Sequence, residues 1–150
     1  GSLLDIGIYP IFLALHTLGK PEKISAKAQM SSTNVDEVCE VQFEYANGAQ
    51  AELHSSIVEH TPTAAEFVLE NAVITIHSRW HEPSTVSIKT SEGSISKSFE
   101  VVSHGYEYEA AHVQEMLRQG KTESDVMSFE KSLELISMLD RVRKEIELEY

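Results

Sequence analysis

Residues 37–57 carry the clearest alternation of apolar and polar side chains in the chain. A two-residue Asn47-Gly48 turn would pair Phe43 with Glu52 and mix the two faces of the resulting hairpin. A three-residue loop, Ala46-Asn47-Gly48, instead pairs Phe43 with Ala51 and keeps one face apolar. The pattern therefore predicts a type I turn in which Gly48 is left-handed and forms a G1 bulge. The residues expected on the apolar face are Cys39, Val41, Phe43, Tyr45, Ala51, Leu53, Ser55 and Ile57.

Apolar residues at helical spacing predict a first helix over residues 2–18, which ends at Gly19 with Pro21 just beyond. Pro10 lies inside this helix. It removes one backbone donor and crowds the carbonyl of Ile6, so we expect a kink near Gly7–Tyr9.

Two further helices are predicted near the C-terminal end. One runs from about Tyr106 to Gln119 and ends at Gly120, and the other runs from about Ser128, which can cap it, to about Glu147. The predicted buried stripe of the last helix consists of Phe129, Leu133, Ile136, Leu139, Val142 and Ile146.

The remaining segments have the period of strands, at about 22–32, 65–70, 72–77, 85–90 and 95–101. A helix, many antiparallel strands and then two helices indicate the α+β class. We expect an open, predominantly antiparallel sheet with the N-terminal helix and the two C-terminal helices on one face. The 150 residues are long enough for one domain with its own core, so residues 1–150 are read as a single domain.

Charge and cysteine content narrow the choice of partners and compartment. The chain has 12 basic and 24 acidic residues, a net charge of -12, which repels phosphate backbones and anionic lipid. Nucleic acid and membrane surfaces are therefore not expected partners. The longest apolar stretch, Ile6 to Leu15, is about half the length that a membrane span needs. Cys39, the single cysteine, cannot form an intramolecular disulfide, which favours a reducing, cytoplasmic location.

Asp5 and Tyr9 are the candidate acid–base pair. They are four residues apart, so a helix places them on one face, one turn apart. A tyrosine needs a nearby cation to act near neutral pH, and the first helix offers only Lys20, at its far end. The alternative is structural: Asp5 caps the helix and Tyr9 packs in the core. The pattern alone favours this alternative.

Several segments resemble the glucose–fructose oxidoreductase, inositol dehydrogenase and MocA family. Gly1-Ser2-Leu3-Leu4-Asp5-Ile6-Gly7-Ile8-Tyr9 is similar to the family's G-G-x-L-x-D-x-G-x-H/Y segment. His104-Gly105-Tyr106-Glu107-Tyr108-Glu109-Ala110 is similar to G-x-G-Y-x-Y-E-A, and Leu117-Arg118-Gln119-Gly120-Lys121-Thr122-Glu123-Ser124 to I-R-x-G-K-x-E-S. Ser132-Leu133 resembles part of the family's E-x-S-L segment. These pieces follow the family's order over essentially the whole chain. Tyr9, where many members have histidine, is most similar to the dihydrodiol and xylose dehydrogenase branch.

The resemblance implies a C-terminal, substrate-side half of an oxidoreductase that moves hydride between nicotinamide and a carbinol of a sugar, polyol or dihydrodiol. It implies that Asp5 binds or orients the substrate hydroxyl and that Tyr9 exchanges its proton. Gly7 would let the backbone approach substrate or cofactor closely. The missing cation would be a lysine of a Glu-Lys-Pro motif in an N-terminal Rossmann domain. That domain is expected to be absent from this chain, together with the site for NAD or NADP.

The sequence contains no Gly-x-Gly-x-x-Gly and no βαβ pattern, so we expect these 150 residues to bind no nucleotide and to be inactive alone. A stand-alone, non-catalytic oligomerisation or binding module is the alternative function.

The other candidate residues predict less chemistry. His77-x-x-x-His81 has a helical metal-ligand spacing but lies in a strand region, so no metal is expected. Trp80 precedes Pro83 in a segment that resembles an aromatic-proline turn of the family, and would line the substrate cleft. Cys39 is predicted to be inert, and His54 to face Glu40 across two strands. Since no helix remains to cover the outer sheet face between Glu37 and His54, a homodimer through the sheet is expected.

Overall fold

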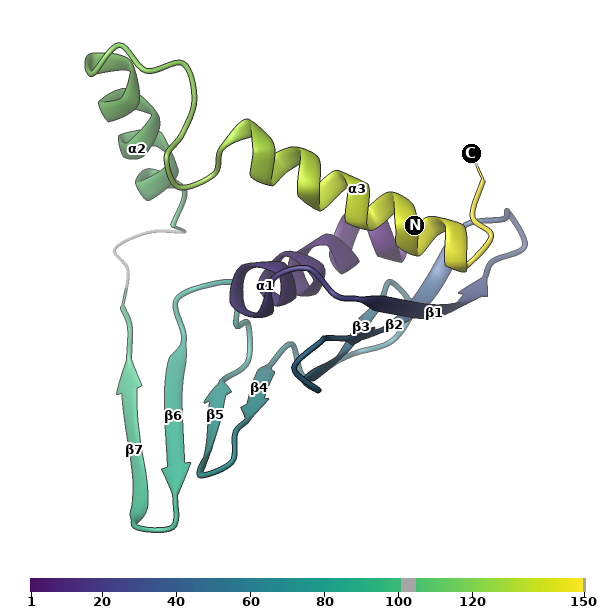
Figure 1. The fold of residues 1–150 in the computed structure, drawn as a ribbon, viewed down its shortest axis with the longest axis horizontal. Helices are drawn as coiled ribbons and strands as arrows, with labels where there is room; N and C mark the ends of the chain where they lie inside the picture. Colours follow the sequence, from purple (N-terminus) through teal and green to yellow (C-terminus); the bar gives the residue numbers. More distant parts are fainter. Residues whose placement is uncertain (101–104, 150) are drawn as a thin grey trace. The chain divides into compact units, whose positions relative to one another are not determined.

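The structure, a computed structural model, describes residues 1–100 and 105–149 (Figure 1). Its contacts divide into two compact units. The first comprises Gly1–Thr61 together with the chain from Asp125 onward, and the second comprises Pro62–Ser124. The first unit contains a π-helical turn η1 (Leu3–Gly7), α1 (Ile8–Leu18), β1 (Lys23–Met30), β2 (Asp36–Glu44), β3 (Gln50–Ser56) and α3 (Phe129–Glu145). The second contains β4 (Ala65–Val68), β5 (Ala72–Ile76), β6 (Thr85–Thr90), β7 (Gly93–Ser98) and α2 (Tyr106–Arg118).

The hairpin of β2 and β3 has the predicted register. Phe43 faces Ala51 and Val41 faces Leu53, while β1 pairs with the other edge of β2 in an antiparallel sheet of three strands. The amide of Gly48 donates to the carbonyl of Tyr45 at 2.9 Å, and the φ of Gly48 is +83°. A side chain there would be strained, so glycine closes the three-residue loop.

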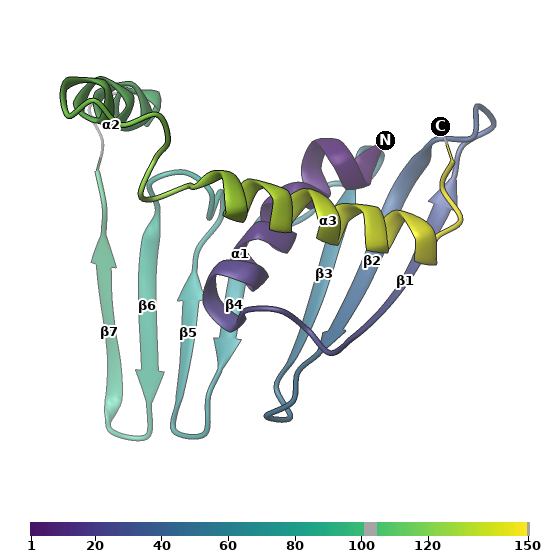
Figure 2. The same ribbon diagram turned by 45° about the horizontal axis from the view of Figure 1, so that its top comes forward.

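The core of the first unit lies between this sheet and a layer of two helices, α1 and α3, which cover the same face (Figure 2). Phe43, in the middle of β2, is fully buried, and Ile11 of α1 and Val142 of α3 are 1% and 0% exposed. The opposite face is polar, because Lys27 pairs with Glu40 at 2.7 Å and Lys23 with Glu44 at 3.3 Å across the strands.

The buried stripe of α3 differs from the predicted one. Leu139 and Val142 are buried as expected, but Phe129, Leu133 and Ile136 are 63%, 71% and 53% exposed. Leu135 and Met138 are buried in their place, at 8% and 3%. The helix is therefore rotated relative to the prediction and leaves an apolar stripe uncovered along its first half. Ser128 caps it as predicted, since its side chain accepts the amide of Lys131.

The second unit is built on an antiparallel sheet in the order β4-β5-β6-β7. Phe67, Ile74, Ile88 and Ile95 face one another across all four strands and form one apolar row. None of the described strand residues of this sheet is fully buried. α2 begins and ends close to its predicted limits and buries Met116, whereas Tyr106 and Leu117 remain largely exposed.

The α+β class and the antiparallel pairing are confirmed, but the described strands form two sheets instead of the one open sheet that was expected. The last predicted strand extended to residue 101, which lies outside the described residues. Among those residues, no helix is both long and apolar enough to cross a membrane.

Candidate functional site

The first helical segment of the chain is not a regular α-helix throughout. Leu3–Gly7 form a π-helical turn, and the regular α-helix begins at Ile8. Proline cannot donate to the carbonyl four residues before it and crowds that carbonyl. The kink that Pro10 predicts near Gly7–Tyr9 stays a prediction. Such π turns occur frequently at functional sites.

Asp5 and Tyr9, the two predicted site residues of this segment, both lie on its exposed side. Asp5 is exposed, and the side chain of Tyr9 is 50% exposed. Phe12 and His16 continue along the same helix and stack, with ring centroids 5.7 Å apart. The structural alternative for Tyr9 is wrong, because a tyrosine packed in the core would be covered. The segment thus presents a carboxylate, a phenol and an aromatic pair to its surroundings.

The structure places the capping group elsewhere than at Asp5. The amide of Leu3 donates to Oδ2 of Asp36, at the start of β2, at 2.6 Å. On the same side of the segment, the hydroxyl of Ser2 donates to that of Ser55 in β3 at 2.8 Å. Asp36, Ser2 and Ser55 are all buried. The sequence does not reveal Asp36 and Ser55 as attachment points, because their partners lie 33 and 53 residues away.

Gly7 is buried rather than open to a cleft. A Cβ at this position would lie 3.0 Å from Oγ of Ser55 and 3.3 Å from a methyl carbon of Leu3. Glycine therefore lets the π turn approach β3 closely. An additional role of Gly7 toward substrate stays a prediction.

Trp80 lies in the second unit, in the connection between β5 and β6. Its amide donates to the carbonyl of Thr63 at 3.1 Å, and its ring meets that of His81 edge to face. Arg79, just before it, has a φ of +62° and pairs with Glu82. These contacts give the tryptophan a defined local setting. That Trp80 lines the substrate cleft stays a prediction.

His77 and His54 lie beside polar partners, and Cys39 is buried. Nε2 of His77 lies 2.8 Å from the hydroxyl of Ser87, and His54 faces Glu40 in the predicted register. Within the described part of the chain, no three His, Cys, Asp or Glu side chains are grouped as metal ligands. Burial and the negative charges of Asp36 and Glu40 raise the pKa of Cys39 to about 11. A thiol this weakly acidic is a poor nucleophile, which supports the prediction that Cys39 is inert.

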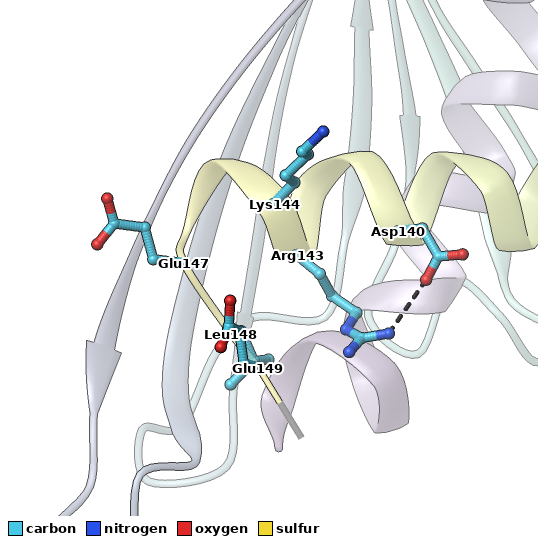
Figure 3. Close-up of a pocket in the computed structure, with 6 residues that line it drawn as sticks. All are labelled: Asp140, Arg143, Lys144, Glu147, Leu148 and Glu149. Atoms are coloured by element: carbon cyan, nitrogen blue, oxygen red, sulfur yellow. Dashed lines mark hydrogen bonds and ion pairs between the residues drawn. The ribbon is translucent and has the colours of Figure 1, made fainter.

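A hollow of about 670 Å³ is found at the C-terminal end of α3 (Figure 3). It is lined by Asp140, Arg143, Lys144, Glu147, Leu148 and Glu149. Arg143 reaches Asp140 across it, with 3.1 Å between Nη1 and Oδ1. Small-molecule sites are mostly lined by apolar side chains, whereas this lining is almost entirely charged. None of the predicted site residues contributes to it.

Comparison with known proteins gives a consistent family relationship. Residues 1–96 match the sequence model of the GFO/IDH/MocA C-terminal domain. The chain is 30% identical to trans-1,2-dihydrobenzene-1,2-diol dehydrogenase of Xenopus laevis over 158 residues, which cover 100% of the chain and 48% of the relative. It is 29% identical to the scyllo-inositol 2-dehydrogenase (NADP(+)) IolU of Bacillus subtilis over 151 residues, which cover 100% of the chain and 45% of the relative. The chain therefore spans about half the length of these curated relatives.

A solved structure shows the same fold. The 3-ketoreductase KijD10 of Actinomadura kijaniata, in complex with TDP-benzene and NADP, matches with a TM-score of 0.84 at 20% identity. The match covers 97% of this chain and 47% of that one. The resemblance predicted from the motifs, including that to the dihydrodiol dehydrogenase branch, is confirmed.

Proposed function

Because the chain belongs to the GFO/IDH/MocA family through its C-terminal domain, we propose that it forms the substrate side of an NAD(P)-dependent oxidoreductase. The substrate is a carbinol of a sugar, polyol or dihydrodiol, or the corresponding carbonyl compound. The relatives support this class, since they are named as dehydrogenases of a dihydrodiol and of scyllo-inositol.

The half-exposed Tyr9, on an exposed face that it shares with Asp5, is the observation that carries this proposal. Oxidation of a carbinol requires that its oxygen lose a proton, and reduction of a carbonyl requires that it gain one. Tyr9 holds and moves this proton at its phenol oxygen. Asp5, one turn before it, accepts a hydrogen bond from the substrate hydroxyl and orients it. The π turn, which contains Asp5 and ends two residues before Tyr9, agrees with a functional segment.

The described residues do not fit a dinucleotide. All described strand pairs are antiparallel, whereas the pyrophosphate site of a Rossmann domain lies in a parallel βαβ unit. We therefore place NAD or NADP, which supplies the hydride chemistry, on a second domain of a longer protein. The 150 residues alone bind no nucleotide and catalyse no hydride transfer.

The helix layer of the first unit is the docking surface for that second domain. Leu133 and Ile136 of α3 are 71% and 53% exposed, and Ile6 and Phe12 at the start of the chain are 36% and 38% exposed. Contiguous exposed apolar side chains mark interaction surfaces. The relatives have room for such a domain, since the matched region covers 48% and 45% of their lengths.

We also propose a homodimer through a sheet face, but through the sheet of the second unit instead of the outer face between Glu37 and His54. The outer face of β1–β3 carries cross-strand ion pairs and suits water. The row of Phe67, Ile74, Ile88 and Ile95 is apolar across four strands, and Ile95 is 70% exposed. A second copy of the chain would cover this row.

The experiment that tests the function is Tyr9→Phe in the full-length enzyme. The change keeps the ring and removes only the oxygen, so the single-turnover rate should fall by about 10²–10⁴-fold while nucleotide affinity is unchanged. Tyr106→Phe is the matched control, because Tyr106 is 76% exposed in α2 and should be neutral. A Tyr9→Phe enzyme with the wild-type single-turnover rate would refute the assignment and favour a non-catalytic binding module.

A further inference from the structure

Asp36 is a buried carboxyl group bound to the helical segment that carries Asp5 and Tyr9. It is 0% exposed, and its Oδ2 accepts the amide of Leu3 at 2.6 Å. The first amides of a helical segment have no partner within the segment, and the segment's N-terminal end is electropositive. The carboxyl group of Asp36, from a neighbouring strand, accepts one of these amides and lies at this electropositive end. Burying such a group is costly unless it is hydrogen-bonded, so its place is defined by that bond.

The second carboxyl oxygen of Asp36, Oδ1, lies close to the backbone of Gly1. Oδ1 is buried and has no hydrogen-bond partner among the described residues. It lies against Gly1, where an added Cβ would come within 1.8 Å of Oδ1 and 2.9 Å of Val35. Only a residue without a side chain fits over the carboxyl group. Glycine therefore lets the backbone before Leu3 pass close to the start of β2.

A second attachment holds the same segment to β3. Ser2 and Ser55 share a buried hydrogen bond of 2.8 Å, and Gly7 lies against the same Ser55 hydroxyl. The turn is thus attached to two adjacent strands of a packed sheet through its buried side. Asp5 lies between these attachment points in sequence, and its side chain is on the exposed side.

We propose that Asp36 is a positioning residue: through the Leu3 amide and the contact with Gly1 it sets the place of the π turn on the sheet, and so the place of Asp5 and Tyr9 against the substrate. This inference rests on the proposed function of those two residues. Catalytic groups must be held closely, since a misplacement of about 1 Å can cost about 10²-fold in rate. Two strands of a packed sheet are a firmer support than the turn's own hydrogen bonds.

The test uses the full-length enzyme and two variants. Asp36→Ala leaves the Leu3 amide without its acceptor, and the single-turnover rate of the folded enzyme should fall by about 10- to 100-fold with nucleotide affinity unchanged. Asp36→Asn keeps a carbonyl oxygen for that amide, so it should retain more of the rate than Asp36→Ala. Val41→Ala is the matched control: it weakens the same strand at a buried core position that takes no part in the bond to the Leu3 amide. Its rate per folded molecule should stay at the wild-type value.

The double variant with Tyr9→Phe separates positioning from a purely structural role. If Asp36 acts through Tyr9, Asp36→Ala should lower the rate much less in the Tyr9→Phe background than in the wild type. Equal losses in both backgrounds, or a normal rate per folded molecule in both Asp36 variants, would overturn the inference. If Asp36→Ala does not fold, the Asp36→Asn rate and its double variant decide in the same way. A Tyr9→Phe enzyme with a normal rate instead overturns the proposed function, so the two failures are distinguishable.

Discussion

The two faces of α3 can be tested with one substitution at two positions, Leu139→Ala and Leu133→Ala. Leu139 is 2% exposed in the core of the first unit, whereas Leu133, six residues earlier, is 71% exposed. Both are leucines in the interior of one helix, so the change in helix propensity is the same. Any difference in stability therefore reports the packing of the side chain alone.

The expected magnitudes differ severalfold. Removing a buried leucine side chain costs about 2–5 kcal/mol, because transfer free energy is lost and a cavity remains. A loss of about 3 kcal/mol corresponds to a fall in Tm of roughly 6–12 °C for a chain of this size. An exposed leucine should change the free energy of unfolding by no more than about 0.5 kcal/mol.

Thermal and urea unfolding, followed by far-ultraviolet circular dichroism, measure both values. Fluorescence of Trp80, which lies in the second unit, serves as an internal control. The unfolding transition that it reports should be the same in both variants. In the full-length protein, Leu133→Ala should lower the free energy of unfolding by about 1–3 kcal/mol more than it does in the 150-residue chain, because a docked second domain would bury that side chain. Equal losses at the two positions in the 150-residue chain would refute the observed stripe. A loss at Leu133 that is the same in the short and full-length proteins would refute docking at that residue.

Two other predictions concern the sheets. The chain should self-associate in sedimentation equilibrium at tens of micromolar, and Ile95→Asp should shift it to monomer. Glu52→Lys, on the polar face of the other sheet, is the control and should leave the association unchanged. A clean wild-type monomer would contradict this prediction. Lys27 lowers the pKa of Glu40 through its hydrogen bond and charge, so Lys27→Met should raise that pKa in an NMR titration, whereas Lys23→Met, which removes the partner of Glu44, should leave it unchanged. Because the folded pKa of Glu40 is lowered, the stability from this pair is fully present above the unfolded value near ~4.3 and is lost as the pH falls through the folded pKa.

The sequence predicted the hairpin of β2 and β3 down to its register because parity decides it. Shifting the pairing by one residue would place polar residues of β3 opposite Phe43 and Val41 and mix the two faces. The loop length follows from the same constraint, and the positive φ of Gly48 agrees with it.

The buried face of α3 could not be predicted in the same way. Leucine, isoleucine and methionine occupy two overlapping stripes of this helix, and both include Leu139 and Val142. Only packing against α1 and β1 selects Leu135 and Met138 over Leu133 and Ile136. Asp36 was missed for a related reason. It begins an ordinary strand in the sequence, and its role depends on a backbone amide 33 residues away.

The proposed site and the proposed docking surface belong to the same helix layer. Docking of a second domain on this layer would therefore both stabilise the association and complete the site. A second domain that covers Leu133 and Ile136 also approaches the layer that carries Tyr9 on its exposed side. The apolar contact would stabilise the association, and the same association would complete the site by bringing the nicotinamide to the substrate. The first unit would then be the rigid support of the site, in which Asp36 and Ser55 attach the π turn that contains Asp5 to the sheet. The charged outer face of β1–β3 would take no part in either proposed contact, which agrees with its cross-strand ion pairs.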